Sequence, residues 1–151
     1  MKKILRFIII LIPWLLEGLL FKVDLEYYNT LNLPSFTLPN KIISILWLFI
    51  YILISISIYK ISNIKNIFKE KDYFYVLITN YLANQLFIYG FFYLKSPFFG
   101  FILTTITLVS SIFLFLESKK LNTKASFYLI PYIIYNVYAF ILSLTIYIMN
   151  F

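Results

Sequence analysis

Long apolar runs alternate with short polar segments along most of the chain. Five runs approach the roughly 20 residues that a helix needs to cross the hydrocarbon core of a bilayer. They cover residues 4–21, 42–61, 73–94, 98–116 and 125–149. The runs are continuous, whereas the strands of a membrane barrel alternate apolar and polar residues over about ten positions. The pattern therefore predicts an all-α integral membrane protein, a five-transmembrane-helix bundle.

The connections between the runs are short, with one exception. Residues 22–41 form the longest connection, and its prolines and asparagines favour an ordered loop over a helix. A loop of this length between two spans is typical of a lid over a cavity. The third and fourth runs are separated by only a few residues, which makes their helices antiparallel neighbours. With no repeat and no linker, we expect a single membrane domain over residues 1–151, its first run retained rather than cleaved.

Composition supports the membrane interpretation and narrows the chemistry. Hydrophobic residues make up 62% of the 151 residues and charged residues 13%, against roughly 45–50% and 25% in soluble domains. An ordinary soluble enzyme, a disordered segment and a nucleic-acid-binding protein are therefore excluded. The chain contains neither Cys nor His, so no metal site, cofactor or catalytic constellation is expected. Glu17 is the one acidic residue inside a predicted run, and it lies near the outer end of the first run. At this depth, pairing of its carboxylate with a loop is favoured over a role as a proton relay.

Basic residues predict the orientation in the membrane. Ten lie at the N-terminus and in the second and fourth connections: Lys2, Lys3, Arg6, Lys60, Lys65, Lys69, Lys71, Lys119, Lys120 and Lys124. Three lie in the connections on the opposite side: Lys22, Lys41 and Lys95. Because basic connections stay in the cytoplasm, this bias predicts a cytoplasmic N-terminus and an external C-terminus.

Polar and aromatic residues recur at helical spacing within four of the runs. Such residues turn away from lipid, toward one another or toward a ligand. The four sets are Trp47, Tyr51, Ser55 and Tyr59; Tyr81, Gln85, Tyr89 and Phe92, with Asn80 and Asn84 nearby; Thr104, Thr107 and Ser111; and Tyr128, Tyr132, Tyr135, Ala139 and Ser143. The Thr/Ser set favours interhelical hydrogen bonding. The three aromatic sets leave two interpretations open, helix packing or the lining of a pocket for a flat, mostly apolar ligand.

Several motifs then follow one another in a characteristic order. Residues 27–34 read YYNTLNLP and are followed by Thr37, Pro39, Trp47 and Tyr51; Gln85 and Leu86 open a second element; a third runs from Ala125 through residues 131–135, PYIIY, to Ala139 and Asn150. In this order and spacing the motifs resemble the TspO/MBR family, the translocator or tryptophan-rich sensory proteins. The resemblance covers essentially the whole chain.

The chain also departs from the family pattern, most visibly in its loss of tryptophan. Leu38 replaces the first of the paired prolines, and Ser143 replaces an asparagine of the last helix. Tyr89 and Phe92 replace an asparagine and a tryptophan of the third helix, and Tyr135 replaces a tryptophan of the fifth. Trp14 and Trp47 are the two tryptophans of this divergent, tryptophan-poor sequence.

The resemblance implies a membrane receptor or carrier that binds tetrapyrroles such as porphyrin in a pocket inside the bundle. The positions that it implies for ligand binding are Tyr28, Pro39, Trp47, Tyr51, Gln85, Tyr89, Phe92, Tyr135 and Ala139. It also implies a homodimer, and a bacterial cell membrane as the location.

Three other functions remain open at this stage. Photochemical degradation of porphyrin is compatible with Trp47, whereas Tyr135 in place of a tryptophan disfavours it. A secondary transporter would call for an inward carboxylate pair or a sequence repeat, and neither is present. A structural membrane protein without a tetrapyrrole ligand is the third alternative.

Overall fold

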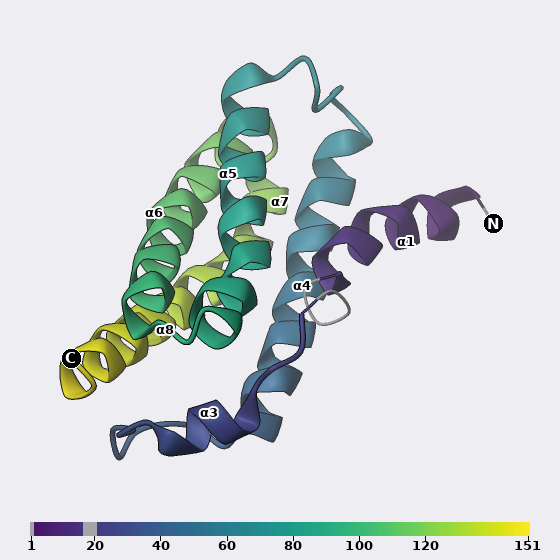
Figure 1. The fold of residues 1–151 in the computed structure, drawn as a ribbon. Helices are drawn as coiled ribbons and strands as arrows, with labels where there is room; N and C mark the ends of the chain where they lie inside the picture. Colours follow the sequence, from purple (N-terminus) through teal and green to yellow (C-terminus); the bar gives the residue numbers. More distant parts are fainter. Residues whose placement is uncertain (1, 17–20) are drawn as a thin grey trace.

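The computed structural model describes residues 2–16 and 21–151 (Figure 1). All regular secondary structure in these residues is helical, with η1 a π-helix and η2 a 3₁₀-helix. The elements are α1 (Lys2–Leu15), α3 (Leu25–Thr30), α4 (Asn40–Ser62), α5 (Lys71–Ile88), η1 (Tyr89–Tyr93), α6 (Pro97–Leu121), α7 (Thr123–Ser126), η2 (Phe127–Leu129) and α8 (Ile130–Met149).

Three of the predicted spans are long and apolar enough to cross a membrane. They are Asn40–Ser62, Pro97–Leu121 and Thr123–Met149, with mean hydropathies of 2.5, 2.2 and 1.8. In contrast, α1 has 14 residues, about 21 Å at the helical rise, and α5 carries polar residues in its centre. The membrane class is thus confirmed, whereas the count of five spans stays a prediction. Residues 17–20 of the first predicted span, Glu17 among them, lie outside the described residues.

The second half of the chain forms the packed part of the bundle. Helix α6 lies between α5 and α8, and α1 packs on α4 (Figure 1). The turn between η1 and α6 is short because Ser96 caps α6, its hydroxyl accepting a hydrogen bond from the Phe99 amide, and Pro97 begins the helix. The predicted antiparallel pairing of the third and fourth runs is confirmed.

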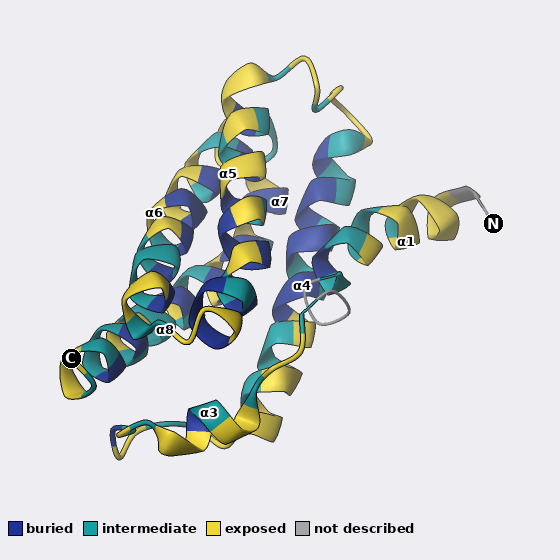
Figure 2. Ribbon diagram, in the orientation of Figure 1, coloured by how far each residue is buried: buried dark blue, intermediate teal, exposed yellow. Residues whose placement is uncertain are grey.

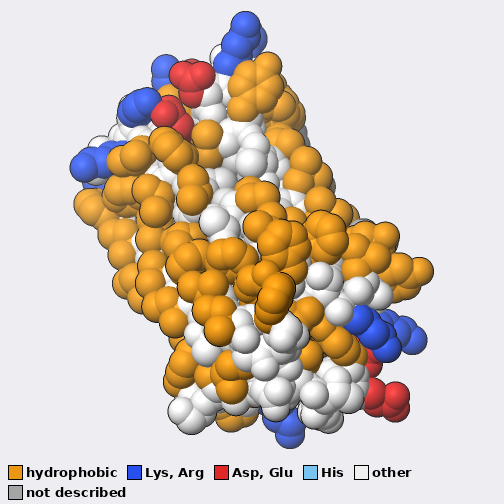
Figure 3. All heavy atoms as spheres, turned by 60° about the vertical axis from the view of Figure 1, so that its left-hand side comes forward, with side chains coloured by type: hydrophobic (Ala, Val, Ile, Leu, Met, Phe, Trp, Pro, Cys, Tyr) orange, Lys and Arg blue, Asp and Glu red, His pale blue; other side chains and the backbone are white. Residues whose placement is uncertain are grey.

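The lateral surface of the bundle is apolar. Figure 2 shows exposed residues along the outer faces of α5, α6 and α8, and many of them are large hydrophobic side chains, such as Ile106, Phe113, Ile134 and Val137. In Figure 3 hydrophobic side chains cover most of the visible face, and charged side chains gather toward its ends. A soluble protein does not expose apolar surface on this scale, so this surface is the one that contacts lipid.

The three basic segments that the sequence assigns to one side of the membrane lie at one end of the bundle. The Arg6 guanidinium donates to the Asn63 side-chain oxygen at 2.9 Å and to the Ser62 carbonyl. The Lys60 ammonium lies 5.5 Å from the centre of the Tyr128 ring. These contacts join the N-terminal segment, the α4–α5 connection and the start of the last helix. Which side of the membrane this end faces stays a prediction.

One local prediction is wrong: residues 22–41 are not a loop throughout. They contain α3, whose first turn is capped by Asp24, with its carboxylate accepting a hydrogen bond from the Tyr27 amide at 2.9 Å. The prolines that favoured a loop, Pro34 and Pro39, both lie after this helix, so they do not interrupt it.

Candidate functional site

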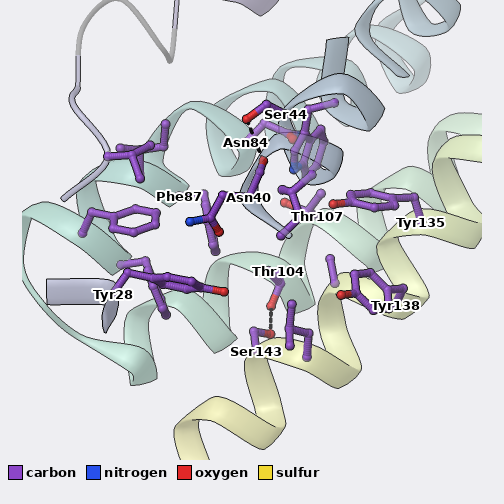
Figure 4. Close-up of a pocket in the computed structure, with 18 of the residues that line it drawn as sticks. Tyr28, Asn40, Ser44, Asn84, Phe87, Thr104, Thr107, Tyr135, Tyr138 and Ser143 are labelled. Atoms are coloured by element: carbon purple, nitrogen blue, oxygen red, sulfur yellow. Dashed lines mark hydrogen bonds between the residues drawn. The ribbon is translucent and has the colours of Figure 1, made fainter. Parts of the chain in front are cut away.

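A cavity of about 530 Å³ lies between the helices at the end of the bundle where α3 crosses (Figure 4). Its lining side chains come from α3, α4, α5, η1, α6 and α8. In Figure 4, Tyr28 and Phe87 lie on one side of the cavity, and Tyr135 and Tyr138 lie on the other. The volume falls within the range of about 300–1,000 Å³ typical of small-molecule sites.

One aromatic wall is centred on Trp47 of α4. The Trp47 ring lies 5.4 Å from the Tyr51 ring and 5.2 Å from the Tyr135 ring, which it meets edge to face. Behind Tyr51 lies Trp14 of α1, at 5.8 Å between ring centres. Because each ring is held by its neighbours, this wall is preorganised for stacking on a flat ligand.

The second aromatic wall is formed where α5 passes into η1. Phe87 stacks on Phe91 at 5.6 Å, Phe91 meets Phe92 at 4.8 Å, and Tyr28 of α3 lies 6.0 Å from Phe92. Gly100 of α6 allows this wall to form, because a Cβ at that position would overlap the Phe91 ring. The absence of one side chain on α6 thus sets the position of a cavity-lining ring.

Part of the cavity wall is polar. Thr104 of α6 and Ser143 of α8 share a hydrogen bond between their hydroxyls, which confirms the predicted interhelical bonding for Thr104; the Ser111 hydroxyl instead donates to the Leu108 carbonyl within α6. Asn84 donates to the Tyr132 hydroxyl at 2.7 Å, and this hydroxyl donates to the Asn80 side-chain oxygen at 2.9 Å. Asn84, Thr104 and Ser143 line the cavity, so these two sets of hydrogen bonds place polar groups on the wall of an otherwise apolar space.

Residues 22–41 pass across one end of the cavity. Asn40, Lys41 and Ser44 are exposed and line the cavity, which makes this end its mouth. The segment is fastened to α8, since the Asn32 backbone exchanges two hydrogen bonds with the Asn150 side chain at 2.8 and 3.0 Å. We call residues 22–41 the lid; that this segment acts as a lid stays a prediction.

Two ionisable groups of the lid have shifted pKa values. The hydrogen bond from the Tyr27 amide, together with the Lys95 ammonium at 3.3 Å, holds the pKa of the Asp24 carboxyl below its usual range. Burial raises the pKa of Tyr28, with a further contribution from Tyr138. At neutral pH Asp24 is therefore charged and caps α3, and Tyr28 presents a neutral hydroxyl.

Six of the nine predicted site residues line the cavity: Tyr28, Trp47, Tyr51, Phe92, Tyr135 and Ala139. Pro39, Gln85 and Tyr89 do not. Pro39 is exposed and precedes α4, and its neighbours Asn40 and Lys41 line the mouth instead.

The face of α5 toward the cavity differs from the predicted face by about one residue. It runs through Asn84, Phe87 and Phe91, which share one side of a helix. Gln85 is buried elsewhere, with no partner for its amide among the described residues. Tyr89 packs on Phe21 and Tyr93. A motif gives the order of residues along a helix, but packing against α6 fixes which side faces inward.

Sequence analysis did not assign several lining residues to a site, notably Phe87, Phe91, Asn136 and Tyr138. The signal for Asn136 was present in the chain: it lies four residues after Tyr132 and three before Ala139, so it shares their helix face.

Comparisons with known proteins agree with this architecture. A model of the TspO/MBR family matches residues 7–149. An uncharacterized membrane protein, YtaB, of Bacillus subtilis is 34% identical over 136 residues, which cover 88% of this chain and 86% of that protein. The tryptophan-rich protein TspO of Bacillus cereus is 31% identical over 134 residues, covering 89% and 87%.

Proposed function

The chain belongs to the TspO/MBR family, and on this premise we propose that it is a membrane receptor or carrier whose cavity binds a flat, largely apolar molecule, specifically a tetrapyrrole such as a porphyrin. The observation that carries the proposal is the pair of aromatic walls, one around Trp47 and one around Phe91, on a cavity of about 530 Å³. Aromatic walls hold a planar ring system by its faces.

The distribution of polar groups supports a ligand with acidic groups at one edge. Lys41 is exposed at the mouth of the cavity, where its ammonium attracts a carboxylate at the edge of a bound porphyrin. The chain has no His or Cys, so recognition relies on the ring faces and the periphery of the ligand rather than on ligation of a central metal by these residues.

The lid supports reversible binding. Its hydrogen bonds to Asn150 and its ion pair between Asp24 and Lys95 are exposed or partly exposed, and such contacts are individually weak. Opening of the lid would break these contacts and would also separate the buried Tyr28 ring from Phe92, 6.0 Å away, while the contacts among α5, α6 and α8 remain. The family resemblance further suggests that the protein acts as a homodimer in the cell membrane.

Titration of the detergent-purified protein with protoporphyrin tests the proposal. Quenching of the fluorescence of Trp14 and Trp47 is expected to saturate at one porphyrin per chain. A haem complex is expected to lack a six-coordinate low-spin spectrum. Quenching that rises without saturation, as in micelles alone, would contradict a defined site.

A further inference from the structure

Asn136 combines three properties that no other described residue of the cavity shares. It lies on α8 and lines the cavity, its side chain is 1% exposed, and both the nitrogen and the oxygen of its amide lack a hydrogen-bond partner among the described residues. A buried amide without partners is strongly disfavoured in an apolar interior. Asn136 therefore has unused capacity to donate and to accept.

Asn84 provides the contrast, because it is also a buried asparagine of the cavity. Its amide nitrogen donates to the Asn80 carbonyl at 2.9 Å and to the Tyr132 hydroxyl at 2.7 Å. Asn84 thus contributes to holding α5 against α8. Asn136 has no such structural bond, although it lies one helical turn from Tyr132.

The place of Asn136 in the cavity determines what it contacts. The mouth residues Asn40, Lys41 and Ser44 are exposed, whereas Thr107 and Asn136 are buried and lie further along α6 and α8 from the helix ends near residues 22–41. A flat molecule that lies between the aromatic walls presents its inner edge to these buried residues. A primary amide pairs best with a group that carries a donor and an acceptor side by side.

We propose that Asn136 is the specificity-determining residue of the cavity, and that it selects planar ligands whose inner edge carries an N–H beside a carbonyl, as a lactam does. The lactam N–H donates to the Asn136 oxygen, and the Asn136 nitrogen donates to the lactam carbonyl. This assignment rests on the proposed function of the cavity as a site for flat molecules, and adds to it the chemistry of the ligand edge. A tetrapyrrole with a lactam ring at its edge would pair with Asn136, whereas a porphyrin has no N–H beside a carbonyl at its edge and would leave the Asn136 amide unpaired.

A matched pair of compounds tests the assignment. Phenanthridinone is a flat tricyclic lactam, and its N-methyl derivative keeps the ring area but loses the N–H. Isothermal titration calorimetry of the detergent-purified protein is expected to give a dissociation constant about tenfold lower for phenanthridinone than for its N-methyl derivative. The reason is that phenanthridinone can form two hydrogen bonds with the buried Asn136 amide, whereas the N-methyl derivative cannot donate. In Asn136→Leu, which keeps the branched shape and the number of side-chain heavy atoms and removes both polar atoms, the ratio is expected to fall to about one.

Thermal unfolding separates recognition from a structural role. Asn136→Leu is expected to unfold at the wild-type temperature or above it, because no internal hydrogen bond is lost. The control Asn84→Leu is expected to unfold about 5 °C lower, since it loses its bonds to Asn80 and Tyr132.

The possible negative results distinguish the role of Asn136 from the proposed function of the cavity. Equal affinities for the two compounds in the wild-type protein, or an unchanged ratio in Asn136→Leu, would overturn the role of Asn136. Saturable porphyrin binding without binding of either lactam would also overturn it, and would leave the proposed function standing. If porphyrin and both compounds all fail to bind, the result would contradict the proposed function as well as the role of Asn136.

Discussion

Trp47 is the residue on which the two interpretations of the aromatic sets differ most. It lies near the start of α4, a depth at which tryptophan commonly anchors a helix at the membrane interface. In the structure it is partly buried, lines the cavity and meets Tyr135 edge to face at 5.2 Å. This position favours a contact with ligand over an anchor in the headgroup region.

Substitution of Trp47 distinguishes these roles. Trp47→Phe keeps an aromatic ring but removes the indole N–H, and we expect up to about a tenfold loss of porphyrin affinity, equivalent to one neutral hydrogen bond of 0.5–1.5 kcal/mol. Trp47→Ala should weaken porphyrin binding further. Trp47→Phe should have little effect on thermal stability. Absorbance of the porphyrin itself reports binding in both variants. Unchanged affinity in both, together with lower stability, would identify Trp47 as an anchor.

At the scale of the elements, the close approach of α6 to the end of α5 and to η1 determines the shape of the cavity. Two glycines, Gly90 in η1 and Gly100 in α6, lie at this contact. Small residues are favoured where membrane helices approach closely. The two glycines differ in what an added methyl group would meet.

We expect Gly100→Ala to lower the unfolding temperature in detergent more than Gly90→Ala does. A Cβ on residue 100 overlaps the Phe91 ring and lies 3.3 Å from the Phe91 Cβ, so the base of that side chain must move. A Cβ on residue 90 lies 3.3 Å from the Phe99 Cβ as well, but its closest contact, at 2.8 Å, is with the end of the Leu103 side chain, which can turn away. Overpacking costs about 1–3 kcal/mol, and porphyrin affinity should fall with it because Phe91 lines the cavity. Equal unfolding temperatures for the two variants would contradict this account of the contact.

The difference between sequence and structure is also clearest at the elements. Hydropathy located α4, α6 and α8 to within a few residues, because long apolar helices are set by local composition. The side of α5 that faces the cavity was not predicted correctly, since the Gln85 and Tyr89 motif positions carry no information on how α5 rotates against α6. Helix α3 was missed because its signal is one capping residue, Asp24, in a segment rich in turn-forming residues.

At the scale of the whole molecule, the basic segments and the mouth of the cavity lie at opposite ends of the bundle. The basic segments of the N-terminus, the α4–α5 connection and the start of the last helix meet at one end through Arg6 and Lys60. The lid, the mouth of the cavity and Asn150 lie at the other end. With the positive-inside rule, this arrangement predicts that the mouth faces the outside of the cell.

The orientation can be measured with a reporter that is active only in the cytoplasm. Fused after Phe151, it is expected to be silent, whereas the same reporter fused within the basic connection after Asn63 is expected to be active. A reporter that is strongly active after Phe151 would show that the ten-to-three bias of basic residues does not set the topology, and would place the cavity mouth in the cytoplasm.

The central claim is that a flat ligand binds inside the cavity rather than on the apolar exterior, and two substitutions on α8 test it directly. Ala139 lines the cavity, whereas Val137, two residues away, is 42% exposed on the outer surface. The measurement is the dissociation constant of protoporphyrin for the wild-type protein, Ala139→Phe and Val137→Phe in the same detergent. Filling the cavity with Ala139→Phe is expected to weaken binding by about tenfold or more, and Val137→Phe is expected to bind as the wild-type protein does. Equal binding by all three proteins would contradict a site within the bundle.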